Sequence, residues 1–157
     1  EGDVLEMWAG LGYYRRARML LKAAQTVQKE HCGLIPSSAA SLLSLPGVGQ
    51  YTAGAVASIA YDEQTPLVDG NVARVLARIR AIGKLPKGAP GGEKSFWALA
   101  TSLMASAWDE GDSDARPGCL NQALMELGAT VCLGGAATPL CEECPVGMAK
   151  GRDGSSL

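Results

Sequence analysis

Residues 45–55 read LPGVGQYTAGA, a Pro-Gly-Val-Gly turn that leads directly into a run of small and apolar residues. The run has the composition of a helix, and a turn of this kind exposes backbone N–H groups at the helix N-terminus. These donors and the positive end of the helix dipole can hold an anion such as a DNA phosphate. The same pattern also forms an ordinary tight turn between two helices. The stretch therefore predicts two helices joined by a glycine hairpin, with phosphate binding as one of two interpretations.

Further along the chain, residues 68–75 read VDGNVARV and place one carboxylate, that of Asp69, at the start of the next helix. The commonest role of such an aspartate is that of an N-cap, which accepts a hydrogen bond from a backbone N–H two or three residues later. The alternative role is to present a charge to a molecule bound nearby. The two roles are compatible, because the N-terminus of a helix favours the ionised form of a carboxylate.

The composition predicts an all-α fold. Of the 157 residues, 47% are hydrophobic and 19% are charged, as in folded proteins of one domain or two small lobes. Alanine is frequent, only 5% of the residues are aromatic, and apolar and polar residues do not alternate over long stretches. No apolar run is long enough to cross a bilayer, so no membrane partner is expected.

Apolar periodicity, glycine and proline divide the chain into helices and loops. The expected helices cover residues 4–11, 17–33, 39–44, 51–60, 69–80, 93–107 and 121–131. Loops are expected at residues 84–92, which are rich in glycine and proline, and at the acidic segment 109–114. The acidic segment lacks the glutamate that a calcium loop needs at its twelfth position, so we interpret it as a solvated connector.

The net charge of −2 argues against a general basic surface of the kind that binds nucleic acid without specificity. The charge is uneven, because residues 1–90 hold ten Lys and Arg against seven Asp and Glu, whereas residues 91–157 hold four against nine. Phosphate contacts are therefore expected mainly in the first part. Arg74, Arg78 and Arg80 lie off the apolar face of their helix. They could contact phosphates, but a solvated face is the commoner role of such arginines.

Three cysteines, Cys132, Cys141 and Cys144, follow the last expected helix with the spacing C-x8-C-x2-C. Two cysteines separated by two residues turn their sulfurs to a common centre, as in zinc and iron–sulfur sites. Cys119, a group other than cysteine, or nothing would complete the site. The alternatives are a reduced pair without a metal and, in a secreted chain, disulfides. Cys32, near a helix end, is expected to be a free thiol.

Four stretches taken together resemble the signatures of the helix-hairpin-helix DNA glycosylases, and within them of the MutY-type adenine glycosylases. They are residues 8–18 (WAGLGYYRRAR), 45–55, 68–72 (VDGNV) and 121–132 (NQALMELGATVC). The resemblance runs from Glu1 to Cys144. It implies most of a six-helix-barrel lobe at residues 1–90, with the hairpin at 45–51, and part of an iron–sulfur-type lobe with its cysteine loop at 91–157.

The resemblance also implies which residues carry the chemistry. Breaking the bond between adenine and its sugar develops positive charge on the sugar, and Asp69 would stabilise or trap that oxocarbenium ion. Tyr51 and Asn71 would support Asp69 and organise the reacting nucleotide. Bifunctional relatives carry a lysine at position 51, whose amine forms a Schiff base that leads to strand cleavage. Tyr51 thus implies a monofunctional enzyme, and it disfavours a lyase.

The DNA contacts implied by the resemblance fall in two places. The hairpin residues that would hold the DNA backbone are Leu45, Gly47, Val48, Gly49 and Gln50. Tyr13 would be the wedge, an aromatic side chain inserted into the base stack that helps to extrude the target base. The alternative for Tyr13 and Tyr14 is packing in the core, and we expect that at least one of them does only that.

These implications together predict a base-excision repair enzyme, a glycosylase that removes adenine mispaired with 8-oxoguanine or guanine from double-stranded DNA and acts as a monomer. The alternative is a catalytically inactive helix-hairpin-helix module that only binds DNA. The family uses a glutamate as general acid on a helix that would precede Glu1, and a downstream domain that reads 8-oxoguanine. We therefore expect these 157 residues alone not to excise adenine. The compartment is not indicated.

The resemblance implies a 4Fe–4S cluster at Cys132, Cys141 and Cys144, but the match is incomplete. Family members have four cysteines, with a first gap two residues shorter and the fourth cysteine about where residues 148–152 stand. No cysteine follows Cys144 in this chain. The expectation is a cluster that is lost or is completed by another ligand.

Overall fold

A computed structural model describes residues 1–83, 92–109 and 116–148. Within these ranges the chain is helical and has no strand, which confirms the predicted all-α fold. The elements are α1 (Gly2–Met7), α2 (Tyr14–Glu30), α3 (Ala39–Leu42), α4 (Gln50–Tyr61), α5 (Gly70–Ile79), α6 (Gly92–Asp109), α7 (Pro117–Thr130), the 3₁₀ turn η1 (Cys141–Glu143) and α8 (Pro145–Met148). No helix in the described ranges combines the length and the apolarity of a membrane span.

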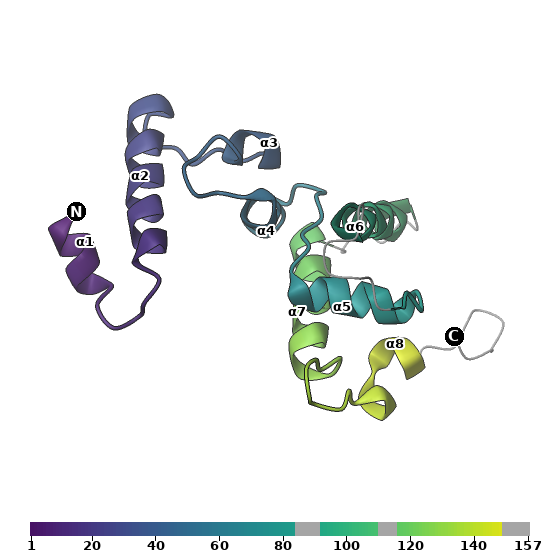
Figure 1. The fold of residues 1–157 in the computed structure, drawn as a ribbon. Helices are drawn as coiled ribbons and strands as arrows, with labels where there is room; N and C mark the ends of the chain where they lie inside the picture. Colours follow the sequence, from purple (N-terminus) through teal and green to yellow (C-terminus); the bar gives the residue numbers. More distant parts are fainter. Residues whose placement is uncertain (84–91, 110–115, 149–157) are drawn as a thin grey trace.

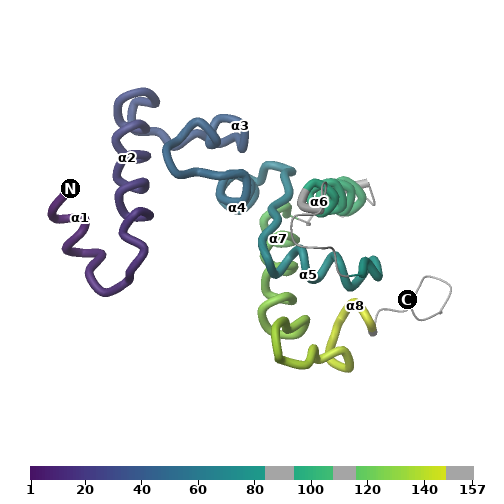
Figure 2. Tube along the Cα trace, viewed as in Figure 1, coloured from purple at the N-terminus to yellow at the C-terminus, as the bar shows by residue number. Residues whose placement is uncertain are grey.

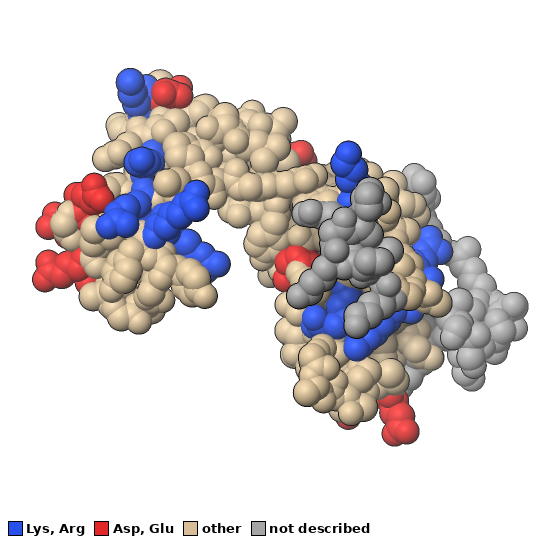
Figure 3. All heavy atoms as spheres, in the orientation of Figure 1, with Lys and Arg blue, Asp and Glu red and all other residues tan. Residues whose placement is uncertain are grey.

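The helices form an arch with two arms (Figure 1). One arm consists of α1 and α2, the pair α3 and α4 bridges the top, and α5 to α8 make the second arm. The tube in Figure 2 shows the same course of the chain, which passes from one arm to the other through the bridge. The arms remain separate in the space-filling view as well, and they face each other across a hollow (Figure 3).

One hydrophobic core fastens α2 to α3 and α4. Its buried residues are Val27, Leu42, Leu45, Ala53 and Ala57. Ser38 starts α3 by accepting a hydrogen bond of 3.2 Å from the backbone N–H of Ser41. In the hairpin, Gly47 has a φ of +79°, and a Cβ atom there would lie 2.5 Å from the Cβ of Met19 on α2. Glycine is therefore required at this contact, which holds the hairpin against α2.

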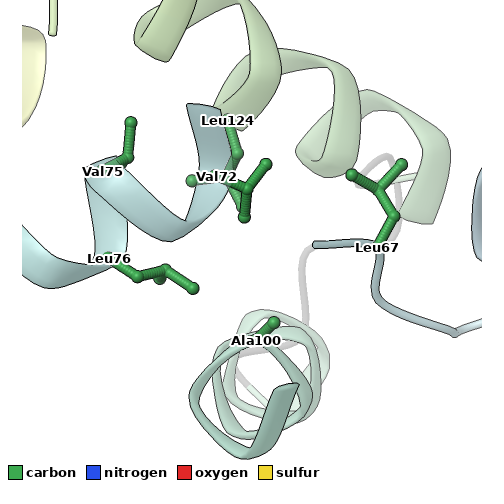
Figure 4. Close-up of a cluster of buried hydrophobic side chains, with 6 residues drawn as sticks. All are labelled: Leu67, Val72, Val75, Leu76, Ala100 and Leu124. Carbon is green, nitrogen blue, oxygen red and sulfur yellow. The ribbon is translucent and has the colours of Figure 1, made fainter. Parts of the chain in front are cut away.

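A second core joins α5, α6 and α7 in the other arm (Figure 4). Its buried residues are Leu67, Val72, Val75, Leu76, Ala100 and Leu124. Three of them, Val72, Val75 and Leu76, come from one face of α5, as the apolar spacing of that helix predicts. Because α5 is buried along this face, its N-terminal residue and the preceding Asp69 have a fixed place in the fold.

The segment that leads from α4 to Asp69 is held by Asn121, a side chain of α7 that is only 1% exposed. Its Nδ2 donates hydrogen bonds to Oγ of Ser58 at 2.8 Å and to the carbonyl oxygen of Thr65 at 3.0 Å. Its Oδ1 accepts one of 3.3 Å from the N–H of Leu67. This buried amide thus connects α7, α4 and the segment before Asp69. Polar groups that are shielded from water need hydrogen-bond partners within the protein, and Asn121 supplies them here.

The predicted helices all exist, and their ends differ by a few residues. The largest differences are four residues: α1 ends at Met7 instead of residue 11, and α7 begins at Pro117 instead of residue 121. Proline is well suited to the first position of a helix, where its missing N–H needs no partner. The loops expected at 84–92 and 109–114 lie largely outside the described residues, but Gly92 and Asp109 themselves belong to α6.

Candidate active site

Asp69 is the N-cap of α5. Its Oδ1 accepts a hydrogen bond of 2.8 Å from the backbone N–H of Val72. Its Oδ2 accepts a second one of 3.3 Å from Nδ2 of Asn71. The side chain is half-buried, so its carboxylate is held by two donors and still has access to solvent. The predicted capping role is confirmed, and the same two contacts fix the direction of the carboxylate.

Asn71 lies at a close approach of α5 to α7. A Cβ atom on Gly128 of α7 would lie only 2.7 Å from the Cβ of Asn71, so this crossing requires glycine. The Oδ1 of Asn71 accepts a hydrogen bond of 2.7 Å from Nη2 of Arg74. The two ends of the Asn71 amide are therefore both engaged, one by Arg74 and the other by Asp69.

Tyr51 stands in the first turn of α4, and its side chain is 41% exposed. Its hydroxyl donates to Sδ of Met125 at 3.6 Å. Met125 and Gly128 are three residues apart on α7 and so lie on the same face of that helix. Tyr51 and Asn71, which are 20 positions apart in the sequence, thus approach one face of α7.

The hairpin presents the N-terminus of α4. Gly49 is its N-cap in an extended conformation, and no described side chain caps this end. Gly47, Gly49 and Gln50 are exposed, so the backbone donors of the first turn are accessible to an anion. This geometry fits the predicted phosphate contact.

Two hairpin residues, Leu45 and Val48, pack in the core. The side chain of Leu45 is only 6% exposed and belongs to the core between α2 and α4. Val48 is half-buried and packs against the same core, and its N–H donates to the carbonyl oxygen of Leu45 at 3.1 Å. The side chain of Leu45 thus anchors the hairpin, and the predicted contact of this residue with the DNA backbone stays a prediction.

Tyr13 and Tyr14 lie at the start of α2. Tyr13 has a left-handed backbone with a φ of 48°, and its side chain is 79% exposed. The guanidinium carbon of Arg16 lies 5.1 Å from the centre of its ring, a cation–π contact. Tyr14 is 43% exposed. The expectation that at least one of the two packs in the core is therefore wrong for the described chain, and the exposed ring of Tyr13 fits the predicted wedge.

Basic side chains accompany Tyr13 on this arm. The residues Arg15, Arg16, Arg18 and Lys22 of α2 are all exposed. In Figure 3 most of the Lys and Arg side chains of this arm lie toward the hollow, and most of the Asp and Glu side chains lie along its outer edge. The concentration of phosphate contacts in the first part of the chain, predicted from its charge, is compatible with this distribution.

The three cysteines of the C-terminal segment line a cavity of 660 Å³ between α5, α6 and the end of α7. The rest of its wall is mainly apolar, as with Leu76 and Leu103. Cys132 and Cys144 are half-buried, and Cys141 is exposed.

A cluster with four cysteine ligands does not fit the described residues. Cys119 lies at the opposite end of α7 from the cavity, and positions 119 and 130 are separated by about 17 Å along the helix. Cys32 follows α2 in the other arm. Among the described residues, no three or more Cys, His, Asp or Glu side chains are grouped so that they could hold a metal ion. No chemical step is therefore assigned to a cluster.

More than half of the chain matches one known protein family. Residues 1–96 match the model of the HhH-GPD superfamily base excision DNA repair protein. The chain belongs to the HhH-GPD superfamily. The matched part includes the hairpin, Tyr13, Tyr51, Asp69 and Asn71.

Relatives of this HhH-GPD chain include proteins named adenine DNA glycosylase from Arabidopsis thaliana, at 51% identity over 144 residues, and from Homo sapiens, at 50% over 145 residues. Another, from Mycobacterium tuberculosis, is 41% identical over 144 residues. Each alignment covers 92% of this chain. The chain spans 21% and 24% of the length of the first two relatives, and 44% of the third.

Solved structures confirm the HhH-GPD fold. A thermostable thymine-DNA glycosylase superposes with a TM-score of 0.71 at 26% identity, covering 92% of this chain and 61% of the other. A trapped complex of endonuclease III with DNA has a TM-score of 0.64 at 22% identity, with the same coverage. The expected helix-hairpin-helix glycosylase fold is therefore correct.

Sequence reasoning missed what two arginines of this HhH-GPD chain do. Arg74 donates to the carbonyl oxygens of Gly128 at 2.6 Å and Cys132 at 2.8 Å, and Arg78 donates to that of Leu133 at 2.7 Å and to Sγ of Cys132 at 3.2 Å. The side chain of Arg74 is half-buried and fully engaged, whereas that of Arg78 is exposed and binds the loop after α7. Their spacing of four residues places both on one face of α5, which was the available signal.

Proposed function

We propose that the full-length protein carrying these residues is a monofunctional adenine DNA glycosylase of base-excision repair. The observation that carries the proposal is the arrangement around Asp69, a carboxylate that caps α5 and is oriented by Asn71 beside α7. Relatives from plants, mammals and bacteria are named adenine DNA glycosylase, which supports adenine as the nucleobase that is removed. The proposed substrate is adenine opposite 8-oxoguanine or guanine in double-stranded DNA.

The reaction replaces the bond between adenine and C1′ of the sugar by a bond to water. As the bond breaks, the electron pair leaves with adenine, a proton is added to the base, and positive charge grows on the sugar. A carboxylate held within reach of C1′ stabilises that charge by direct attraction or by forming a temporary bond to C1′. Water then attacks C1′, loses a proton, and leaves an abasic site. Asp69 is the group in this chain to which we assign that role.

The residue at position 51 supports a monofunctional reaction. Strand cleavage through a Schiff base needs an amine that attacks C1′. Tyr51 offers a phenol, and its hydroxyl is directed to Sδ of Met125. We therefore propose that the product is an intact strand with an abasic site.

DNA would lie against the bridge and the arm formed by α1 and α2. The exposed N-terminus of α4 supplies backbone donors for a phosphate, and the basic face of α2 supplies exposed cations. Tyr13 stands beside these cations with an aromatic side chain that can enter the base stack. Since one chain supplies all of these groups, we propose that the protein acts as a monomer.

The test is a base-release assay with the full-length protein and four duplexes that differ only in one pair: adenine opposite 8-oxoguanine, guanine or thymine, and thymine opposite guanine. The proposal expects release of adenine from the first two, detected by chromatography, and no borohydride-trapped adduct with any of them. Binding to all four duplexes without base release would support the inactive DNA-binding module. A trapped adduct would establish a lyase and contradict the role given to Tyr51.

A further inference from the structure

The cysteine loop, residues 131–144, is closed by its own backbone. The N–H of Leu140 donates to the carbonyl oxygen of Val131 at 2.9 Å. These two residues directly precede Cys141 and Cys132, so the hydrogen bond brings the two ends of the gap between these cysteines together. A metal centre that bound both cysteines would have the same effect, because its ligands must converge. The loop therefore has a closure that needs no metal.

Arg78 fastens the cysteine loop to α5. Its Nη1 donates to the carbonyl oxygen of Leu133 at 2.7 Å and to Sγ of Cys132 at 3.2 Å. Both acceptors lie in the first residues of the loop, directly after α7. A charged donor makes stronger hydrogen bonds than a neutral one, so this contact can hold the start of the loop in place. One of the three sulfur atoms thus has a partner within the protein.

Apolar side chains seat the same loop against the helices. Val131, Pro139 and Leu140 share the wall of the 660 Å³ cavity with Leu76 of α5 and Leu103 of α6. Packing of this kind withdraws apolar surface from water whether or not a metal is present. The loop is therefore fixed to its surroundings by backbone, by charge and by apolar contact.

The described chain supplies too few sulfur atoms for an iron–sulfur cluster. A 4Fe–4S cluster takes four cysteine thiolates, and none of residues 145–157 is a cysteine. The other cysteines lie elsewhere, Cys119 at the opposite end of α7 and Cys32 after α2. In the described ranges, no three Cys, His, Asp or Glu side chains converge on a point where a metal ion could bind. The three cysteines of the loop therefore do not form even an incomplete ligand set.

We propose that the protein carries no iron–sulfur cluster, and that its cysteine loop is held instead by the closure between Leu140 and Val131 and by Arg78. The proposal departs from the cluster that the family resemblance implies. It is independent of the proposed glycosylase function, because the loop can be held in either way whatever reaction the site performs. It follows that the order of the loop depends on Arg78 and not on the thiols of Cys141 and Cys144.

Metal analysis tests the first half of the proposal. Iron and acid-labile sulfide are measured in the full-length wild-type protein after anaerobic purification from cells supplied with iron. The proposal expects less than about one iron atom per ten folded chains, against four per chain for a complete 4Fe–4S cluster. Equal amounts of iron and sulfide above that level would overturn the proposal, since a ligand outside these residues would then complete the site.

Hydrogen exchange tests the second half, measured by mass spectrometry on peptides from the cysteine loop of the full-length protein. Arg78→Met should raise the exchange rate of the loop by roughly fivefold, the effect of losing about one hydrogen bond. The double variant Cys141→Ser, Cys144→Ser should stay within about twofold of the wild type. The reason is that, in the described part of the loop, no hydrogen bond reaches either of these two sulfur atoms.

Arg80→Met is the matched control. Arg80 lies beside the same cavity at the end of α5, and in the described chain its exposed side chain makes no hydrogen bond to the loop. It should exchange within about twofold of the wild type. Equal exchange in Arg78→Met and Arg80→Met would overturn the proposal.

A cluster would give the opposite order of effects, because the loss of two ligands would release the cluster and free the loop. Faster exchange in the double cysteine variant than in Arg78→Met would therefore also overturn the proposal. If Arg78→Met does not fold, the metal analysis of the wild-type protein decides, since it needs no variant.

Discussion

Nδ2 of Asn121 lies 2.8 Å from Oγ of Ser58, and both side chains are buried in the interface between α7 and α4. This contact and the bonds from the same amide to Thr65 and Leu67 fix the segment that leads to Asp69. The position of the candidate carboxylate thus depends on a polar group in the core of the protein.

The first prediction concerns this amide. Asn121→Ala leaves the N–H of Leu67 and the carbonyl oxygen of Thr65 buried without their partner, so it should lower the free energy of unfolding by roughly 3 kcal/mol. Urea denaturation measures the change. The control is Gln122→Ala, since Gln122 is exposed and should change the free energy by less than about 0.5 kcal/mol. Similar effects of the two substitutions would contradict the assigned role of Asn121.

A second prediction concerns the close approach of α7 to α4. A Cβ atom on Gly118 would lie 2.7 Å from Cα of Ile59 and 2.8 Å from the carbonyl oxygen of Ser58, and this backbone cannot move aside. Gly118→Ala should therefore lower the free energy of unfolding by about 2 kcal/mol. Gly70→Ala is the matched control, because a Cβ there meets no atom within 4 Å. Denaturation curves that coincide for the two variants would show that the helices are further apart than described.

The sequence predicts a contact in this site when the two contacting residues are close together in the chain, and fails to predict it when they are far apart in the chain. Asp69 as a cap depends on residues within three positions of it, and local rules predict it correctly. Arg74 finds its carbonyl partners 54 and 58 positions later, and no local rule connects them. The burial of the Leu45 side chain could not be predicted from the hairpin motif alone, because it depends on Val27 and Ala53 from other helices.

The helix boundaries also show this difference between local signals and contacts made far along the chain. Helices with a strong apolar period, such as α2 and α5, are predicted to within a few residues at their N-termini, since the signal lies in the helix itself. The first turn of α7 was missed, although Pro117 is a local signal for it, because proline often begins a helix. The exposure of Tyr14 was missed because an aromatic residue beside an apolar stripe is ordinarily buried.

A third prediction tests the hairpin as a phosphate site. Gln50 is the first residue of α4, and proline is tolerated at that position, after an extended residue such as Gly49 with its ψ of 176°. Gln50→Pro removes one backbone N–H and should weaken binding to a DNA duplex by roughly tenfold without loss of stability. Gln50→Ala keeps the N–H and should bind as the wild type does. Equal affinities of the two variants, measured by fluorescence anisotropy, would exclude a contact through this donor.

A fourth prediction tests Tyr13 as the wedge. A 2-aminopurine placed beside the target adenine brightens when the stack is opened, and Tyr13→Ala should remove most of that increase on binding. Tyr13→Phe keeps the ring and should retain the increase, because insertion needs an aromatic surface and not the hydroxyl. If the alanine variant brightens the probe as the wild type does, another residue opens the stack.

The central claim is that the charge of Asp69 acts on the reacting sugar, and Asp69→Asn tests it most directly. Asparagine caps a helix as well as aspartate does, so the hydrogen bond to Val72 and the fold should survive while the charge is lost. In the full-length protein, single-turnover release of adenine from an 8-oxoguanine:adenine duplex should fall by roughly a thousandfold, with duplex affinity unchanged within about threefold. Excision at the wild-type rate, or a loss of DNA binding together with excision, would contradict the account and leave Asp69 as a structural cap.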